Sequence, residues 1–248
     1  MYKLFSSLIN QRISTTLDAE QPVEQAGFRK GFSTIDHIHT LELLIEKYHE
    51  RRRTLYIAFI DYKKAFDTVD HSSIWETLKE QGVENVYIQI IKNIYTNNKG
   101  RVKLEKTGPS FPIDRGVRQG DPLSPKLFIA TLESIMRKLD WKKYGLNIDG
   151  KYLSHLRFAD DLVLLSETGS QLQLMIPSLN KASKKFRLEM NLSKTMLMTN
   201  STETKISVDN DVLTYTGKYI YLGKEICLDR NSIGSDLERT IQRSWNKY

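Results

Sequence analysis

Two adjacent carboxylates interrupt an otherwise apolar stretch of the chain, "FADDLVLLSE", at residues 158–167. The apolar runs on either side are typical of paired strands, so Asp160 and Asp161 are expected at the turn of a β-hairpin. On this stretch alone, solvated turn residues are the simpler interpretation, because Asp tolerates turn geometry. A second interpretation is a divalent cation site, since hard cations such as Mg²⁺ take oxygen ligands. That interpretation requires a third carboxylate from elsewhere in the chain.

The composition limits the classes of partner. The chain has 248 residues, of which 40% are hydrophobic and 27% charged, and this suits one large domain or two small ones. Its net charge of +7 favours a polyanionic partner, with nucleic acid ahead of an anionic membrane. The longest apolar runs, such as "LYIAFI" at 55–60, are far shorter than the roughly 20 residues of a membrane helix, so no membrane span is expected.

Cysteine usage and the start of the chain indicate a compartment. A single cysteine, Cys227, excludes an internal disulfide, and "MYKLFSSLIN" has too short an apolar stretch for a secretory signal. We therefore expect an intracellular protein, in the nucleus or the cytoplasm.

Helical periodicity and strand-like runs alternate along the chain and predict an α+β fold, with a few central antiparallel strands and helices packed on one side. Ser33 and Asp36 form the pattern of a capping box before a helix whose apolar positions recur to Tyr48 and which ends in the basic run at 51–53. Four further helices are expected, at residues 72–81, 84–97, 122–139 and 170–187. Asp121 is expected to cap the third of these, and Pro177 to kink or interrupt the last.

The strands are expected between these helices and after them. "TLYIAFID" is a buried strand that ends at Asp61, and "RVKLEK" is an alternating strand. "NIDGKYLS" carries the Asp-Gly signal of a tight hairpin directly before the hairpin of Asp160 and Asp161. The pieces "KISVD" and "YIYLGKEI" are strand-like.

Asp61 supplies the carboxylate that a cation site requires, although far from Asp160 along the chain. Taken alone, it is a turn residue at a strand end. Two other motifs favour the cation-site interpretation of Asp61: Phe66 follows it in "DYKKAFD", and "RQGDPLSP" stands at residues 118–125.

Together, these motifs resemble the reverse transcriptases of non-long-terminal-repeat retrotransposons and, more distantly, those of group II introns. The resemblance runs in order along nearly the whole chain, through "YKLFSSLINQRI", "QAGFRKGFSTIDHI", "AFIDYKKAFDTVDH", "RGVRQGDPLSP", "FADD", "LEMNLSKT" and "YLG". It implies a right-hand polymerase fold with an antiparallel palm sheet, packed helices and partial fingers. The implied boundaries are partial fingers at 1–54, palm at 55–228 with finger elements at about 72–115, and the start of a truncated thumb at 229–248.

The resemblance also implies the chemistry, which is extension of a DNA primer on an RNA template with deoxynucleoside triphosphates. Asp61 and Asp160 are implied to bridge two Mg²⁺ or Mn²⁺ ions, with Asp161 as the supporting acid. In such a reaction one ion activates the primer 3′-hydroxyl and the other steadies the leaving pyrophosphate. Without metal, the clustered carboxylates should repel each other and be loose or partly protonated.

Residues near the incoming nucleotide are implied in the same way. Phe66 matches an aromatic gate that occupies the space of a ribose 2′-hydroxyl, against the alternative of an ordinary core Phe. Tyr62 is implied to offer its backbone carbonyl to a metal ion. Gln119 and Gly120 resemble a loop that lies against nucleotide and template, where Gly permits close approach.

Four more residues are implied at the edges of the site. Arg29 resembles a finger arginine that clamps the triphosphate, with a solvated surface arginine as the alternative. Lys194 matches a lysine that donates a proton to pyrophosphate. Leu222 and Gly223 are implied to lie under the primer strand, with hairpin-tip packing as the alternative.

The chain departs from the family pattern at Arg187, where the family carries Gly in a left-handed conformation, and at its ends, since it begins within the fingers and stops soon after "YLG". These departures leave a second hypothesis, a catalytically inactive, RNA-binding remnant of a mobile element. A third, an RNA-templated RNA polymerase of related fold, is disfavoured by Phe66.

Overall fold

The computed structural model describes residues 1–96, 98–105 and 107–228, which form two compact units. The first unit, the helical unit, comprises Met1–Lys30, Tyr62–Asp140 and Ser178–Met190. The second, the sheet unit, comprises Gly31–Asp61, Trp141–Pro177 and the described residues from Asn191 to Leu228. The segment 229–248, expected as the start of a thumb, lies outside the described residues. Within the described part, no helix combines the length and apolar character needed to cross a bilayer.

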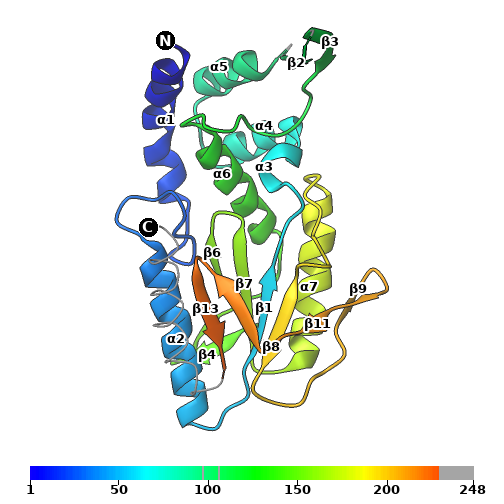
Figure 1. The fold of residues 1–248 in the computed structure, drawn as a ribbon. Helices are drawn as coiled ribbons and strands as arrows, with labels where there is room; N and C mark the ends of the chain where they lie inside the picture. Colours follow the sequence, from blue (N-terminus) through cyan, green and yellow to red (C-terminus); the bar gives the residue numbers. More distant parts are fainter. Residues whose placement is uncertain (97, 106, 229–248) are drawn as a thin grey trace, which may run out of the picture. The chain divides into compact units, whose positions relative to one another are not determined.

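The sheet unit is built on a five-stranded sheet with the order β11-β8-β1-β7-β6 (Figure 1). Its strands are β1 (Tyr56–Ile60), β6 (His155–Phe158), β7 (Asp161–Ser166), β8 (Met196–Thr199) and β11 (Thr214–Tyr215). The central strand β1 pairs antiparallel with both β7 and β8, and all of its residues are buried. The sheet therefore confirms the mainly antiparallel core that the sequence predicted.

One strand of this sheet differs from the expectation. Strand β11 runs parallel to β8, with Thr214 opposite Met196. Between them the chain forms the small hairpin of β9 (Ser207–Val208) and β10 (Asp211–Val212). The extra reversal of direction in this hairpin brings β11 back parallel to β8, which short strand-like runs in the sequence do not reveal.

One face of the sheet forms the core of the sheet unit with helix α2 (Thr34–Glu50) and the hairpin of β12 (Lys218–Tyr221) and β13 (Lys224–Cys227). Figure 1 shows this hairpin in front of the sheet, with α2 beside it. Leu41 of α2, Phe59 of β1 and Tyr221 of β12 belong to one buried cluster. Helix α2 begins at the predicted capping box of Ser33 and Asp36, which satisfies the first free N–H groups of the helix. The remaining hairpin of the unit, β4 (Leu146–Ile148) and β5 (Lys151–Leu153), has the predicted Asp-Gly turn.

The helical unit is organised around helix α6, which is buried along most of its length and contacts α1 and α4. Its elements are α1 (Tyr2–Ala19), α3 (Ala65–Thr68), α4 (His71–Glu80), α5 (Asn85–Tyr95), β2 (Lys99–Lys103), β3 (Thr107–Pro112) and α6 (Ser124–Arg137). An ion pair between Lys126 and Asp18 joins α6 to α1. The side chain of Gln81 donates a hydrogen bond of 2.8 Å to the Ala130 carbonyl and so joins α6 to the end of α4.

Asp121 does not cap α6, contrary to expectation. The helix begins two residues later than Pro122, at Ser124, with Leu123 in the cap position and Pro125 in the first turn. The Asp121 carboxylate accepts hydrogen bonds from the Leu123 N–H at 3.1 Å and from the Tyr2 hydroxyl at 2.5 Å. Asp121 thus holds α1 against the loop before α6, a long-range role that the local pattern does not show.

Two other local expectations concern α7 (Gly169–Lys184) and the residue that follows it. The helix continues through Pro177 without interruption. Arg187 has φ of 59°, the left-handed conformation expected for this position, and its Nε lies 3.1 Å from Asp70 Oδ1. This conformation costs a non-Gly residue about 1 kcal/mol, which the exposed ion pair offsets only in part.

Candidate active site

The predicted site residues fall into two groups, one in each unit. The sheet unit holds Asp61, Asp160, Asp161, Lys194, Leu222 and Gly223, and the helical unit holds Arg29, Tyr62, Phe66, Gln119 and Gly120.

The register of β1 and β7 brings Asp61 and Asp161 together. Ile60 is opposite Leu162, so the next positions on the two antiparallel strands are Asp61 and Asp161. Residues directly opposite in such a pair have Cβ atoms roughly 5 Å apart and point to the same face. Two carboxylates that are distant in sequence therefore lie side by side at the ends of adjacent strands.

Asp160 lies in the turn that joins β6 to β7. Phe158 pairs with Asp161, so the turn consists of Ala159 and Asp160. Ala159 is buried with φ of 58°, an unfavourable conformation for a residue other than Gly. The tight turn keeps Asp160 next to Asp161 and within electrostatic range of Asp61.

The three carboxylates interact electrostatically. Burial, followed by the negative charges of Asp160 and Asp61, raises the pKa of Asp161 to about 6, although part of its side chain still reaches solvent. Burial and the charge of Asp61 also raise the pKa of Asp160. A cation between these groups would relieve their repulsion.

This donor set fits a divalent metal ion that also takes ligands from elsewhere. Carboxylate oxygens suit Mg²⁺, which commonly binds one or two carboxylates together with water and substrate phosphates. Among the residues that the structure describes, no three His, Cys, Asp or Glu side chains are grouped closely enough to hold an ion. The protein thus offers part of a coordination shell, and a nucleotide could complete it.

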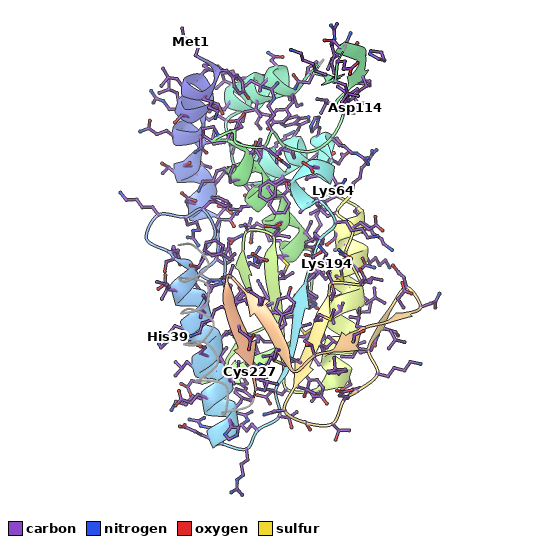
Figure 2. All side chains as sticks on the ribbon, in the orientation of Figure 1. Met1, His39, Lys64, Asp114, Lys194 and Cys227 are labelled. Atoms are coloured by element: carbon purple, nitrogen blue, oxygen red, sulfur yellow. The ribbon has the colours of Figure 1, made fainter. Side chains whose placement is uncertain are left out.

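The backbone of Asp61 is held by the turn that precedes β8. The Asn191 N–H donates a hydrogen bond of 2.7 Å to the Asp61 carbonyl, and the Asp61 N–H donates one of 3.3 Å to Thr195 Oγ1. Lys194, labelled in Figure 2, is exposed on the same turn. Lys194 is predicted from "LEMNLSKT", whereas Asn191 and Thr195 are not, because nothing local in the sequence indicates that they bind the end of β1.

The β12–β13 hairpin covers the sheet face on which Asp61 and Asp161 lie. The Tyr219 ring stacks on Phe59, with centroids 4.1 Å apart, and strand alternation puts Phe59 and Asp61 on one face. Burial, and then the charges of Asp161 and Asp61, raise the pKa of Tyr219. Leu222 and Gly223 form the tip of this hairpin with φ of 49° and 86°, values typical of a tight two-residue turn.

In the helical unit, Phe66 is half-buried, and both its ring and its backbone have contacts that hold it in place. It stacks on Phe128 of α6, with centroids 4.4 Å apart and planes at 23°. The Phe66 carbonyl accepts a hydrogen bond of 2.7 Å from Val117 N–H. Phe128, which the sequence analysis did not identify as a site residue, therefore sets the position of the predicted gate.

Gln119 and Gly120 lie in the exposed loop before α6. Gln119 Nε2 donates a hydrogen bond of 3.0 Å to Asp67 Oδ1, one residue beyond Phe66. Gly120 has φ of 74°, and a Cβ built on it would meet no atom within 4 Å. A glycine at this position permits the positive φ, and the space beside it is open.

Arg29 and Tyr62 have structural partners in the same unit. Arg29 Nη1 donates hydrogen bonds to the carbonyls of Pro22 at 2.6 Å and Gln25 at 2.8 Å. The buried Tyr62 hydroxyl shares a hydrogen bond of 2.8 Å with Ser183. Arg29 would have to exchange at least one of these carbonyls for phosphate oxygens to act as a clamp.

Comparison with known proteins gives a consistent result. A family model described as "Reverse transcriptase (RNA-dependent DNA polymerase)" matches residues 1–226. The chain is 34% identical over 189 residues to the Retrovirus-related Pol polyprotein from type-1 retrotransposable element R2 of Nasonia vitripennis, covering 75% of this chain and 18% of that protein. It is 31% identical over 179 residues to the corresponding polyprotein of element R2DM of Drosophila melanogaster, covering 71% of this chain and 16% of that protein.

A solved structure has a similar fold. Telomerase from Candida tropicalis, in complex with the TWJ fragment of telomeric RNA, aligns with a TM-score of 0.65 at 15% identity, covering 92% of this chain and 37% of that chain. The expected α+β polymerase fold is thereby confirmed. The chain spans less than a fifth of the length of the two polyproteins above.

Proposed function

Because the chain belongs to the reverse transcriptase family, we propose that it is the RNA-directed DNA polymerase core of a non-long-terminal-repeat retrotransposon. It extends a DNA primer on an RNA template with deoxynucleoside triphosphates. The observation that carries this proposal is the placement of Asp61 opposite Asp161 at the ends of β1 and β7, with Asp160 in the adjoining turn.

In this function, the carboxylates would supply part of the coordination shell of the metal. Asp61 and Asp160 would provide oxygen ligands, and the negative charge of Asp161 would support them. When bound, Mg²⁺ or Mn²⁺ supplies activation of the primer 3′-hydroxyl and neutralisation of the leaving pyrophosphate. The hydrogen bonds from Asn191 and to Thr195 keep Asp61 in place.

The remaining residues bind and select the nucleotide. The primer 3′-hydroxyl gives its proton to solvent, and its oxygen forms a bond to the α-phosphorus while the bond from that phosphorus to the β-phosphate oxygen breaks. Lys194 gives a proton to the departing pyrophosphate. Phe66, which stacks on Phe128, excludes a ribose 2′-hydroxyl. Gln119 and Gly120 lie along the nucleotide and the template. The Tyr62 carbonyl would add a ligand to the metal. Arg29 binds the triphosphate after releasing a loop carbonyl.

Support for the nucleic-acid partners comes from the basic net charge of +7 and from the telomerase relative, whose structure contains RNA. Leu222 and Gly223 are the proposed contacts to the primer. Their hairpin is anchored beside the carboxylates by Tyr219, which suits a role in holding the primer end.

The test is primer extension on an RNA template with Mg²⁺, using the wild-type protein and Asp160→Asn. We expect extension by the wild type and a loss of roughly a thousandfold or more in the variant, since metal-assisted stabilisation is worth several kcal/mol. Asp149→Asn, at the turn of the β4–β5 hairpin, is the matched control and should extend normally. Binding of primer and template by the wild type without any extension would favour the inactive, RNA-binding remnant.

A further inference from the structure

One segment of the helical unit has a net positive charge. Residues 97–120 contain six lysines and arginines against two acidic residues, a net charge of +4. Most of this segment is the β2–β3 hairpin, whose described residues are exposed except for the half-buried Gly100 and Gly108. Figure 1 shows the hairpin extending beyond α5. A charged patch of this kind is an electrostatic footprint for a polyanion.

The cations lie on one face of the hairpin. Lys99, Arg101 and Lys103 alternate along β2, and their partners on β3 are Pro112, Ser110 and Thr107, with a shift of register between Arg101 and Lys103. Alternate residues of a strand point to the same face and are about 6.8 Å apart. No acidic residue is paired on this face, and the spacing resembles that of neighbouring phosphates in an extended nucleic-acid strand. The two acids of the segment are Glu105 in the turn and Asp114 at the foot of the hairpin (Figure 2).

The opposite face is apolar and fixes the register. Gly100 pairs with Phe111, and a Cβ on Gly100 would lie 2.6 Å from Phe111 Cζ, so the ring lies directly over the glycine. Val102 is also on this side of β2, and Leu104 follows β2 in the turn, with 57% and 80% of their surface exposed. The hairpin thus presents basic and apolar groups on separate faces. The basic face by itself suits contact with the phosphates of a nucleic acid.

The hairpin has little support from the rest of the described chain. It forms its own two-stranded sheet, and no other described helix or strand packs extensively against it. An isolated two-stranded hairpin is only marginally stable in water. A ligand bound along the basic face would therefore also stabilise the hairpin.

A cavity of about 440 Å³ adjoins the base of the hairpin. Its lining includes Lys99, Arg115 and Arg118, together with polar groups of Asn98 and Gln119 and one acid, Asp67. The Arg118 guanidinium is fixed by hydrogen bonds to Ile94 O at 2.9 Å and Asn98 Oδ1 at 2.6 Å. The volume lies within the range of small-molecule sites, and Lys99 belongs to both cavity and basic face.

We propose that the basic face of β2–β3 and this cavity form one binding surface for single-stranded nucleic acid. Lys99, Arg101 and Lys103 contact successive phosphates, and one nucleotide of the same strand enters the cavity beside Arg115 and Gln119. The proposal rests on the proposed function only in taking that strand to be the RNA template, because the binding itself requires no catalysis.

The experiment measures fluorescence anisotropy of a labelled single-stranded RNA and of DNA of the same sequence, in EDTA and without nucleotides, at several salt concentrations. The test variant carries Lys99→Gln, Arg101→Gln and Lys103→Gln. The matched control carries Lys142→Gln, Lys143→Gln and Lys151→Gln, exposed lysines of the sheet unit with the same change in charge. Thermal melting checks that both variants remain folded.

We expect the hairpin variant to bind RNA roughly 10- to 50-fold more weakly at 0.15 M salt. The slope of log K against log salt concentration should become shallower by about two, since each phosphate contact contributes about 0.7 to it. Arg115→Gln should reduce the slope by a further 0.7 or so. The control triple variant should keep the wild-type slope. An equal loss in both triple variants, or an unchanged slope in the hairpin variant, would overturn the proposal.

Two further arms separate the alternatives. Vesicles containing phosphatidylserine should bind wild type and hairpin variant alike, and a hairpin-dependent loss seen only with vesicles would show a membrane site instead. Loss of RNA binding in the hairpin variant together with no primer extension by the wild type would refute the proposed function alone. Normal extension with hairpin-independent binding would refute this inference alone.

Discussion

Two hairpins of this protein carry charge in opposite ways. The β6–β7 hairpin lies within the five-stranded sheet, where β1 pairs with β7 and fixes Asp61 opposite Asp161. The β2–β3 hairpin stands as a separate two-stranded sheet and presents Lys99, Arg101 and Lys103 to solvent. Burial and mutual repulsion raise the pKa values of Asp160 and Asp161 in the first hairpin, whereas the cations of the second are spread along an exposed strand. The first arrangement suits chemistry that needs exact geometry, and the second suits contact with a flexible polyanion.

The largest expected effect separates catalysis from binding. Asp61→Asn should lower kcat for primer extension by roughly a thousandfold, because a metal ligand is lost, while the Kd for single-stranded RNA changes little. The Lys99, Arg101 and Lys103 triple variant should raise Kd and leave kcat nearly unchanged at saturating template. Steady-state kinetics with both variants measure the two parameters. A large fall in kcat for the triple variant would show that the two hairpins are not functionally separate.

A smaller effect is expected from the support of Asp61. Thr195→Val removes the acceptor of the Asp61 N–H and should reduce kcat about tenfold, in the range found for groups that orient metal ligands. Thr199→Val is the matched control, since Thr199 Oγ1 donates a hydrogen bond of 3.0 Å to Leu55 O at the opposite end of β1. Equal losses in both variants would mean that general damage to the sheet, and not the position of Asp61, explains the result.

How far the sequence predicted this arrangement depends on the range of each interaction. Helix α2 and strand β1 have strong local periodicity, and the structure has both near the predicted boundaries. The bonds of Asn191 and Thr195 to Asp61 and the stacking of Phe128 on Phe66 join residues far apart in the chain, so no local pattern marks them. Asp121 was misassigned for the same reason, because its partner Tyr2 lies 119 residues earlier in the chain.

The third effect concerns the cost of clustering carboxylates in the β6–β7 hairpin. The pKa of Asp161, about 6, lies above the ordinary value of 3.8, so the folded state holds this proton more tightly than the unfolded state. The metal-free protein should therefore lose stability as the pH rises from about 4 through 6.

Asp161→Asn removes this cost because the side chain stays neutral. Allowing for solvent screening of a partly exposed group, the variant should be more stable than wild type by roughly 1 kcal/mol at pH 7.5 and equal to it below pH 4. Urea unfolding in EDTA at both pH values measures the difference, with Asp149→Asn as control. Equal stabilities at pH 7.5 would contradict the electrostatic account of the site.

The smallest effect tests how little the exposed hairpin contributes to folding. Phe111→Ala should change the free energy of global unfolding by no more than about 0.5 kcal/mol, because the ring is 48% exposed and packs on its own hairpin. Phe59→Ala, in the core under Tyr219, should cost about 3 to 5 kcal/mol. Denaturant unfolding of both variants gives the comparison. A loss at Phe111 near that at Phe59 would show that the β2–β3 hairpin is part of a cooperative core.

The most direct test of the central claim is the binding of Mn²⁺, followed by electron paramagnetic resonance, to the protein with primer, template and a non-hydrolysable deoxynucleotide. If Asp61, Asp160 and Asp161 act as one site, wild type should bind two ions whose magnetic coupling corresponds to the spacing of about 3.5 to 4 Å in two-metal sites. Asp61→Asn should lose the coupled signal, and Asp149→Asn should keep it. A coupled pair that persists without Asp61, or no coupled pair in the wild type, would contradict the account.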